Sequence, residues 1–389
     1  MSVQLRVGSM TPHVLHLLDT CSRGGAETLL LDVFRNYSDT DMFIYFCSFQ
    51  GGELEKDLIN TRVKSAKISR KYPVDLVAVL RLRRFIKSNR IDVIHTHFIV
   101  DTVHAYFAII GLNVKIIHTH HGYDFYNSFK DKLSLFFLLP RIDAHIFVSK
   151  TLRKYYTEKY RCINNSFVVY NGVDTRKMVP TGKDIRQELG LDQSVILLGM
   201  VGNFTNTGRD QITICRALVR VVEDYPTVHF VFAGRNSAKN PIYYDECVEF
   251  CHLNNLQGNV HFVGSRNDVQ DILNALDLYV YASNHDTFGL TLVEAMMCDV
   301  PVIANDLSPF LEISDNGKYI DIYQTKNITE LSSKILDKIS SLGHKVSSKE
   351  YARNNFSIQR HLNCLSSVYQ KVLSSKPHDI VQDFDGFFT

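Results

Sequence analysis

Two carboxylates stand eight positions apart in a segment that could bind a phosphorylated ligand. Asp286 and Glu294 flank the sequence Phe-Gly-Leu, and an apolar helical pattern begins at Leu290. The first turn of a helix has backbone N–H groups without intrahelical partners and carries partial positive charge, so it attracts phosphate. One carboxylate could then accept hydrogen bonds from sugar hydroxyls and the other from ribose hydroxyls. An acidic helix cap followed by an exposed glutamate is the structural alternative.

Several clustered histidines could bind a metal ion instead. His95 and His97 lie on one face of a predicted strand, and His118, His120 and His121 form a second cluster. Imidazoles grouped in this way can bind zinc, but no ordered set of carboxylates accompanies them. Packing at strand ends, or contact with a substrate, is therefore the favoured interpretation.

These residues require a framework of alternating strands and helices. Short β-branched or aromatic runs alternate with helical patterns, as in a parallel α/β sheet, and the pattern restarts after the turn signal Asn171-Gly172. We expect two Rossmann-like domains, residues 1–172 and 173–348, with the binding cleft between them. Residues 349–376 predict one amphipathic helix that crosses back to the first domain, and residues 377–389 predict a loose tail.

Length and composition support this organisation. The chain has 389 residues, 45% hydrophobic and 22% charged, which is more than one hydrophobic core usually organises. It contains no apolar run of about 20 residues and no apolar export signal at its start, so we expect a cytosolic protein. The eight cysteines include no C-x-x-C and predict reduced packing residues. Cys247 and Cys251 could bind a metal ion, but no second pair of ligands follows them in the sequence.

The net charge of +2 conceals an asymmetry between the halves. Residues 1–172 carry 23 Lys and Arg against 15 Asp and Glu, whereas the remainder carries 20 against 26. The basic excess gathers between Arg62 and Arg90, where several cations have helical spacing. Such a face attracts anionic lipid, phosphate or nucleic acid, and a solvated helix face is the alternative. We expect peripheral contact with anionic membrane, on its inner face, and no nucleic-acid partner.

Several motifs, in order along the chain, resemble glycosyltransferase family 4. The resemblance covers roughly residues 14–373 and implies the GT-B fold, in which two Rossmann-like domains face a cleft and a C-terminal helix crosses back to the first. The motifs are Gly24-Gly25-Ala26-Glu27, Asp92–His97, His120-His121-Gly122, Val168–Asp174, Phe262-Val263-Gly264 and a Glu-x7-Glu signature that here reads Asp286-x7-Glu294.

Carried over position by position, the resemblance implies a role for each site residue. Glu294 would bind the ribose, Asp286 would hold the transferred sugar, and His121 would lie near that sugar. Arg209 would stabilise the diphosphate, so the implied catalytic residues are His121, Arg209 and Asp286. No metal or other cofactor is implied. The implied donor-binding residues are Gly25, Asn203, Arg209, Arg266, Val269, Asp286, Phe288, Gly289, Leu290 and Glu294, with Arg266 and Val269 near the base and residues 288–290 presenting backbone amides.

Two positions depart from the family pattern. Asp286 is one methylene shorter than the usual glutamate, which could alter the choice of donor. Asn203 stands where a first cation is usual, and Arg209 takes the place of the second only if the loop is one residue longer than in some members. A charge-assisted contact here contributes about 1.5–3 kcal/mol. A surface arginine in a turn is the alternative.

The resemblance implies transfer, with retained anomeric configuration, of a sugar from a nucleotide sugar. A UDP-sugar is the favoured donor, and the expected acceptor is a lipid-linked or growing glycan in cell-surface polysaccharide biosynthesis. Such an enzyme needs no nucleophile, because it positions the substrates and stabilises phosphate charge. A nucleotide-sugar epimerase or phosphorylase on the same fold, or a non-catalytic binding protein, is the alternative. The sugar, the base, the acceptor and the oligomeric state stay open.

Overall fold

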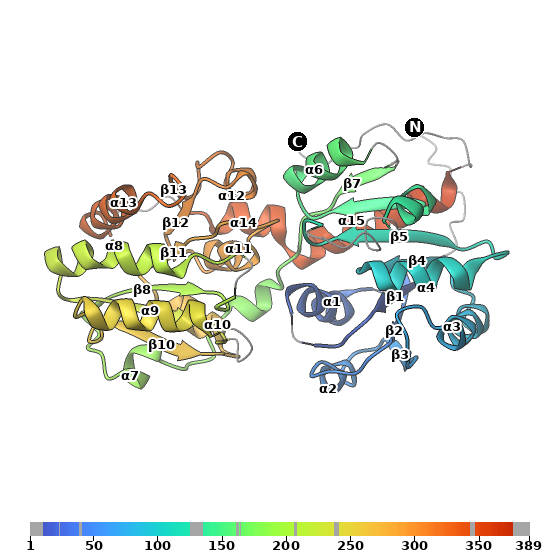
Figure 1. Cartoon of the computed structure of the whole chain (residues 1–389), viewed down its shortest axis with the longest axis horizontal. Helices are drawn as coiled ribbons and strands as arrows, with labels where there is room; N and C mark the ends of the chain where they lie inside the picture. The colour runs from blue at the N-terminus through green and yellow to red at the C-terminus, as the bar shows by residue number, and fades with distance from the viewer. Residues whose placement is uncertain are drawn as a thin grey trace, which may run out of the picture. The chain divides into compact units, whose positions relative to one another are not determined.

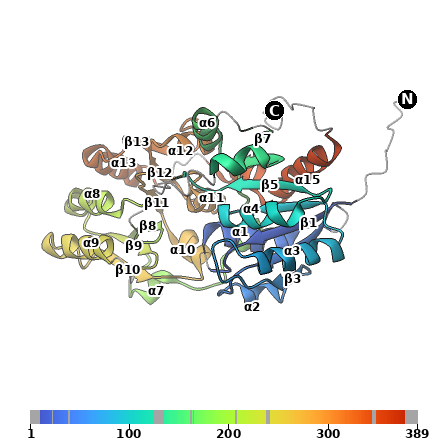
Figure 2. The same cartoon turned by 45° about the vertical axis from the view of Figure 1, so that its right-hand side comes forward.

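Two compact units make up the chain in the computed structural model (Figure 1). Unit 1 comprises Met1–Gly172 with Ile358–Thr389, and unit 2 comprises Val173–Ser357. Each is a parallel sheet with helices on both faces, which confirms the α/β fold class (Figures 1 and 2). The predicted tail, residues 377–389, lies outside the described residues. These are 11–22, 24–38, 41–124, 135–160, 163, 165–205, 208–236, 241–342 and 347–375.

Unit 1 is organised by a seven-stranded sheet in the order β3-β2-β1-β4-β5-β6-β7. The order along the chain reverses between β1 and β4, and open α/β sheets bind ligands beyond the carboxyl ends of strands at such a point. The strands are β1 (His13–Leu18), β2 (Phe43–Ser48), β3 (Lys64–Lys67), β4 (Val93–Thr96), β5 (Lys115–His120), β6 (Ala144–Phe147) and β7 (Ser166–Val168).

Two apolar cores cover the faces of this sheet. Helices α1 (Gly25–Asn36) and α15 (Ile358–Ser374) pack in one core, and α3 (Leu76–Ser88) and α4 (Ile99–Ile109) in the other. Helix α3 begins where it does because the Asp75 carboxylate accepts hydrogen bonds from the first-turn amides. The shorter helices of unit 1 are α2 (Glu55–Leu58), η1 (Leu139–Arg141) and α6 (Lys150–Lys159).

Unit 2 has a six-stranded sheet in the order β10-β9-β8-β11-β12-β13, which reverses between β8 and β11. Its strands are β8 (Ile196–Val201), β9 (Val228–Ala233), β10 (Val260–Gly264), β11 (Leu278–Tyr281), β12 (Val302–Asn305) and β13 (Asp321–Tyr323). Its helices are η2 (Thr175–Met178), α7 (Ile185–Glu188), α8 (Gln211–Asp224), α9 (Ile242–Leu253), α10 (Val269–Ala275), α11 (Leu290–Met297), α12 (Ser308–Ile313), α13 (Ile328–Ser340) and α14 (Lys349–Phe356).

The single helix predicted over residues 349–376 is wrong, because two helices occupy this segment. Helix α14 ends at Phe356, Ser357 is extended with φ −68° and ψ 150°, and α15 begins at Ile358. The Val173 amide donates to the Phe356 carbonyl at 2.8 Å, which directs that carbonyl away from a continuing helix. Helix α14 belongs to unit 2 and α15 to unit 1. No described helix is long and apolar enough to cross a membrane.

Candidate active site

The loops that follow the adjacent strands β8 and β11 are held together by backbone contacts. The Gly208 carbonyl accepts hydrogen bonds from the Asn284 amide at 2.6 Å and from the Ser283 hydroxyl at 2.8 Å. Gly208 has φ +128°, and a Cβ there would lie 2.8 Å from the His285 carbonyl oxygen, so only glycine fits. This contact fixes Arg209, the next residue, at the point where the strand order reverses.

Arg209 is bound in place by its neighbours in unit 2. Its Nη1 atom donates to Asp286 Oδ2 at 2.8 Å, and its guanidinium lies 5.1 Å from the centre of the Tyr281 ring. Burial by itself lowers the pKa of Arg209, but Tyr281 and Asp286 oppose this effect and the pKa is raised overall. Arg209 therefore stays cationic in a partly buried site, rather than standing as a surface arginine in a turn.

The Asp286 carboxylate is saturated with hydrogen bonds. Its Oδ1 atom accepts from the backbone amides of Thr287, Phe288 and Gly289 at 2.7, 3.1 and 3.2 Å. Its Oδ2 atom accepts from Arg209 and from the Tyr281 hydroxyl, the latter at 2.9 Å. A carboxylate offers about four lone-pair positions, so five donors use its full capacity.

Of the three backbone amides expected to face a ligand, those of residues 288–290, only that of Leu290 makes no bond to Asp286. The Phe288 and Gly289 amides, expected to face a ligand, bind Asp286 instead, because the short aspartate side chain folds back onto its own turn. The amides of Leu290 and Thr291 make no hydrogen bond to any described residue. Two backbone donors at the start of α11 are thus available to an anion.

Glu294 lies on the same helix and is partly buried, which excludes a fully exposed helix residue. Burial, assisted by the charge of Glu294, raises the pKa of the Tyr279 hydroxyl. That hydroxyl donates to Thr291 Oγ1 at 3.0 Å. The Glu294 carboxylate therefore lies within electrostatic reach of the junction between β11 and the first turn of α11.

Asn203, the departure from the family pattern, has an unexpected cationic neighbour. Its Oδ1 atom accepts a hydrogen bond at 2.9 Å from the backbone amide of Arg235, which follows β9. The Arg235 side chain is exposed, and its guanidinium makes no hydrogen bond or ion pair with a described residue. Sequence reasoning missed this cation because β9 and β8 are adjacent in space but separated by a helix in the chain.

Arg266, expected near the base, forms ion pairs with two carboxylates. It pairs with Glu188 at 2.6 and 2.8 Å and with Asp268 at 2.9 and 2.8 Å, and these contacts raise its pKa. Val269 is half-buried at the start of α10. Both residues follow β10, the edge strand, two strands from β8. The structure therefore does not bring them into contact with Arg209.

Gly25 and His121 belong to unit 1. Gly25 opens α1, and a Cβ built on it would meet nothing within 4 Å. His121 directly follows β5, and its Nε2 atom lies 3.0 Å from His97 Nδ1. Burial, together with the nearby His361, lowers the pKa of His121 to about 4, so its ring is neutral at pH 7.

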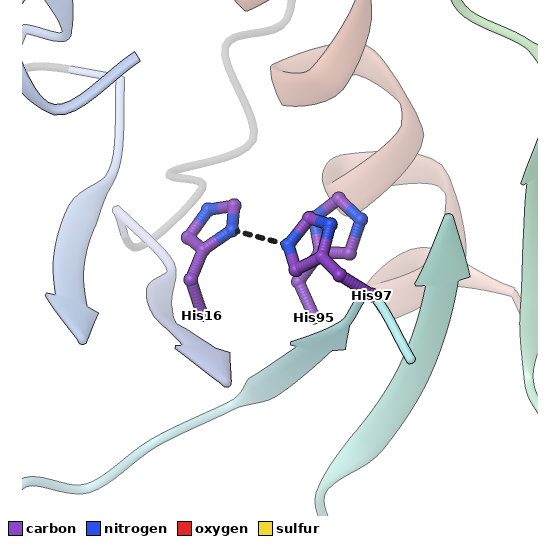
Figure 3. Close-up of side chains that lie close together, drawn as sticks. All are labelled: His16, His95 and His97. Carbon is purple, nitrogen blue, oxygen red and sulfur yellow. Dashed lines mark hydrogen bonds between the residues drawn. The ribbon is translucent and has the colours of Figure 1, made fainter. Parts of the chain in front are cut away.

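Three buried histidines of unit 1 come close enough to suggest a metal site (Figure 3). Nitrogens of His16, His95 and His97 lie within 4.8 Å of one another. The ring planes, however, are only 14° to 36° apart, so the lone pairs do not converge on one point. Both nitrogens of His95 are also hydrogen-bonded, to Tyr369 at 2.7 Å and Thr119 at 2.6 Å. This geometry disfavours a shared metal ion.

The cysteine pair noted in the sequence has a third neighbour. Cys247 and Cys251 are buried on α9, and Cys215 on α8 contacts both. Burial, followed by these two neighbours, raises the pKa of the Cys215 thiol well above its usual value. A protonated thiol is a poor metal ligand, so packing is the favoured interpretation of this group too.

Family models match both parts of the chain. A model described as Glycosyltransferase Family 4 matches residues 23–177, and one described as Glycosyl transferases group 1 matches residues 182–355. Together with the two parallel α/β units, these matches define an enzyme of the GT-B glycosyltransferase class. The chain belongs to glycosyltransferase family 4, as its motifs predicted.

Curated relatives include proteins named for lipopolysaccharide core and O-antigen biosynthesis. The chain is 26% identical to the lipopolysaccharide core biosynthesis mannosyltransferase LpsB of Rhizobium meliloti, over 61% of this chain and 68% of that protein. It is 24% identical to N-acetyl-alpha-D-glucosaminyl L-malate synthase of Bacillus anthracis, over 77% and 80%. An O-antigen biosynthesis glycosyltransferase of Escherichia coli, WclY, is 24% identical over 82% and 91%.

Solved structures share the fold at low sequence identity. A glycosyltransferase from Rickettsia africae superposes with a TM-score of 0.81 at 21% identity, covering 94% of this chain and 100% of that one. HepE of Anabaena, crystallised with UDP, gives 0.80 at 19% identity, covering 93% and 100%. These likenesses confirm the predicted GT-B architecture.

Proposed function

We propose that this enzyme transfers a sugar, with retained configuration, from a UDP-sugar to a lipid-linked or growing glycan in cell-surface polysaccharide biosynthesis. The observation that carries the proposal is the cationic Arg209, fixed beside two unoccupied amides at the start of α11. The relatives named for lipopolysaccharide and O-antigen synthesis support the pathway. The complex of HepE with UDP supports the choice of UDP as the nucleotide of the donor.

The diphosphate of the donor would bind at the start of α11. The Leu290 and Thr291 amides supply two hydrogen-bond donors, and the helix dipole adds partial positive charge. Arg209 supplies a full charge, and Arg235, beside Asn203, places a second cation on the neighbouring loop. These groups neutralise a diphosphate without a metal ion, and we therefore propose metal-independent catalysis.

The remaining site residues keep the roles that the family resemblance implies. Glu294 would accept hydrogen bonds from the ribose hydroxyls, and His121 would contact the transferred sugar. Arg266 and Val269 would lie near the base, and Gly25 near the donor phosphate. Asp286 would hold a sugar hydroxyl through Oδ2, where the sugar must replace the Tyr281 hydroxyl or Arg209 because every lone pair is in use.

Retention of configuration follows if the acceptor attacks the face from which the diphosphate departs. The anomeric C1–O bond to the diphosphate breaks as the acceptor oxygen forms the new C1–O bond. The acceptor proton passes to the departing diphosphate oxygen, so no protein base is needed. Arg209 and the α11 amides stabilise the negative charge that develops on that oxygen.

A thermal-shift panel of UDP-, GDP- and ADP-sugars in EDTA tests this proposal. UDP-sugars should raise the unfolding temperature, since a ligand at 100 times its Kd stabilises a protein by about 2.7 kcal/mol. Release of UDP should require an acceptor and should survive EDTA. Turnover without acceptor would favour the epimerase alternative, and a strict need for Mg²⁺ or Mn²⁺ would refute metal independence.

The variant Glu294→Gln, measured in the same panel, tests whether Glu294 binds the ribose of the donor. The substitution keeps the shape of the side chain but removes the charge that accepts from the ribose. A hydrogen bond to a charged group contributes about 1.5–3 kcal/mol, so donor affinity should fall about 10- to 100-fold. A well-folded Glu294→Gln protein with an unchanged thermal shift would remove Glu294 from the donor site.

We further propose that unit 1 docks on the inner face of an anionic membrane through α3. The exposed face of this helix combines apolar and basic side chains: Leu76, Val77 and Leu80 are 72%, 55% and 55% exposed. Arg81 and Arg84 are exposed one turn further along. Apolar groups of this kind insert at the boundary between headgroups and acyl chains, while each nearby cation adds about 1 kcal/mol on anionic lipid.

Co-sedimentation with phosphatidylglycerol and phosphatidylcholine vesicles measures this docking. Wild-type protein should bind only the anionic vesicles, and binding should weaken as salt is added. Leu76→Ser with Leu80→Ser should weaken it at every salt concentration, because these residues supply the apolar part. The control is Leu253→Ser, since Leu253 is 74% exposed on α9 of unit 2. Equal losses from both variants, or binding indifferent to lipid charge, would contradict the proposal.

A further inference from the structure

One buried side chain contacts both charged groups of the candidate active site. Tyr281 is the last residue of β11 and is completely buried. Its hydroxyl donates to Asp286 Oδ2 at 2.9 Å, and the guanidinium carbon of Arg209 lies over its ring, 5.1 Å from the ring centre. Asp286 and Arg209 also bond each other at 2.8 Å. Each of the three side chains therefore contacts the other two.

The ring of Tyr281 is held in place from several sides. Tyr281 pairs in register with Ala304 of β12, and β11 lies between β8 and β12 inside the six-stranded sheet. The Phe310 ring of α12 packs on it in a T-shaped arrangement, with the centres 5.3 Å apart and the planes at 65°. Phe310 in turn lies against Gly289, where a Cβ would come within 2.9 Å of its ring. A strand residue packed in this way is a rigid support for the groups that it touches.

The hydroxyl of Tyr281 fixes the direction of the Asp286 carboxylate. Three backbone amides hold Oδ1, so the hydroxyl of Tyr281 and the guanidinium of Arg209 decide where Oδ2 points. Burial raises the pKa of Tyr281 well above its usual value, so the hydroxyl keeps its proton and remains a donor. It makes no hydrogen bond to any other described residue. Because a buried hydroxyl without a partner is costly, this bond holds Oδ2 firmly.

The ring of Tyr281 supports the guanidinium of Arg209. A cation over an aromatic ring is attracted by the negative face of the ring, and the attraction is stronger where water is excluded. The Arg209 side chain also lies against Gly202, directly after β8, where a Cβ would come within 3.2 Å of Arg209 Nε. Among the described residues, only Asp286 accepts a hydrogen bond from the guanidinium. The contacts with Tyr281 and Gly202 thus orient the guanidinium and leave its other N–H groups for a ligand.

We propose that Tyr281 is a positioning residue that serves Asp286 through its hydroxyl and Arg209 through its ring. The inference rests on the proposed function, in which Asp286 holds the transferred sugar and Arg209 the diphosphate. Tyr281 sets the spacing between these two groups, so that the sugar and the diphosphate of one donor molecule are bound together in a productive geometry. The two halves of the side chain consequently have separable effects, which a tyrosine that only fills space would not have.

The variants Tyr281→Phe and Tyr281→Leu separate the hydroxyl from the ring. Tyr281→Phe removes one donor to Asp286 and keeps the support of Arg209. We expect kcat for transfer to fall about 10-fold, with the Kd of UDP alone within about 2-fold of the wild-type value. Tyr281→Leu removes the ring as well, so UDP should also bind about 10-fold more weakly. Calorimetric titration with UDP and single-turnover transfer from a UDP-sugar measure the two quantities.

Double-mutant cycles show through which partner each half of Tyr281 acts. In an Asp286→Ala background, Tyr281→Phe should lower kcat no further, because the acceptor of the hydroxyl is already gone. In an Arg209→Met background, Tyr281→Leu should weaken UDP binding no further, because the cation over the ring is gone. Thermal unfolding checks that each variant is folded. If Tyr281→Leu is not, Tyr281→Phe still decides the role of the hydroxyl.

The control is Tyr323→Phe, because Tyr323 is also buried in the same sheet but lies on β13, two strands from β11. It should change neither kcat nor the affinity for UDP. A wild-type kcat in well-folded Tyr281→Phe, or equal losses of UDP affinity from Tyr281→Phe and Tyr281→Leu, would overturn the proposal. Additive effects in either cycle would overturn it as well. Failure of the proposed function gives a different result, since Arg209→Met and Asp286→Ala would then leave UDP binding and transfer unchanged.

Discussion

Arg209→Met should lower kcat about 100- to 1000-fold, the range found when one preorganised donor to a developing negative charge is removed. The guanidinium is held by Asp286 and Tyr281 before any ligand binds, so the wild-type enzyme spends no free energy to orient it. Methionine fills a similar volume but cannot donate. Donor affinity should fall much less than kcat, because the charge on the diphosphate grows as the sugar departs. Single-turnover transfer with a UDP-sugar separates these quantities.

The variant Arg209→Lys is the matched control, because it separates the charge of Arg209 from the several N–H donors of its guanidinium. Lysine keeps the charge but is a single point donor, so it should recover part of the rate. The folded state should tolerate both variants, because the Asp286 carboxylate keeps four other hydrogen bonds. If Arg209→Met transferred sugar at the wild-type rate, Arg209 would be a structural partner of Asp286 and the proposed diphosphate site would be wrong.

Acid should unfold unit 1 between about pH 6 and pH 4, before unit 2. Burial holds the pKa of His145 and His361 at about 4 and that of His16 at about 3, far below the ordinary 6.5. The unfolded chain then binds more protons than the folded one, so stability falls as the pH drops below 6.5. Each of these three groups lowers the free energy of unfolding by about 1.4 kcal/mol for each pH unit below 6.5. By pH 4 the three together remove on the order of 10 kcal/mol, which is the whole stability of an ordinary domain.

Peptide-resolved hydrogen exchange at successive pH values, corrected for intrinsic rates, measures this loss for each unit separately. Peptides from β1, β4, β5 and β6 should lose protection first. Those from β8 and β11 should keep it, because the clearly shifted histidines of unit 2 are the pair His229 and His261, which are only partly buried. Full protection of the unit 1 peptides at pH 4 would contradict the argument.

Sequence periodicity was sufficient to predict the α/β class, because strand runs and helical patterns are local properties. Whether Arg209 takes the place of the family's second cation stays a prediction; the structure places Arg209 after Gly208, whose carbonyl bonds the loop after β11. The saturation of Asp286 could not be foreseen, since the residues that bind it include Tyr281, whose hydroxyl direction depends on packing.

The contact between His16 and His97 shows why sequence reasoning does not find long-range partners. His16 and His97 are 81 positions apart and meet only because β1 and β4 are neighbours where the strand order reverses. Nothing in the local sequence marks His16 as different from a packing residue of a buried strand. The end of α14 at Phe356 is a similar case, because no glycine or proline stands there and the Phe356 carbonyl is bonded by the amide of Val173, which is distant in the sequence.

The division of unit 1 into two stretches of chain affects how the protein is made. Unit 2 is continuous from Val173 to Ser357, whereas the core of unit 1 includes α15. The Tyr369 ring of this helix packs against His95 of β4, and its hydroxyl bonds the same histidine. Domains normally fold in order of synthesis, starting at the N-terminus. Here the ribosome completes unit 2 while one apolar face of the first sheet still awaits its covering helix. We therefore expect the first unit to be translated to be the last to complete its core, which requires the helix at the far end of the chain.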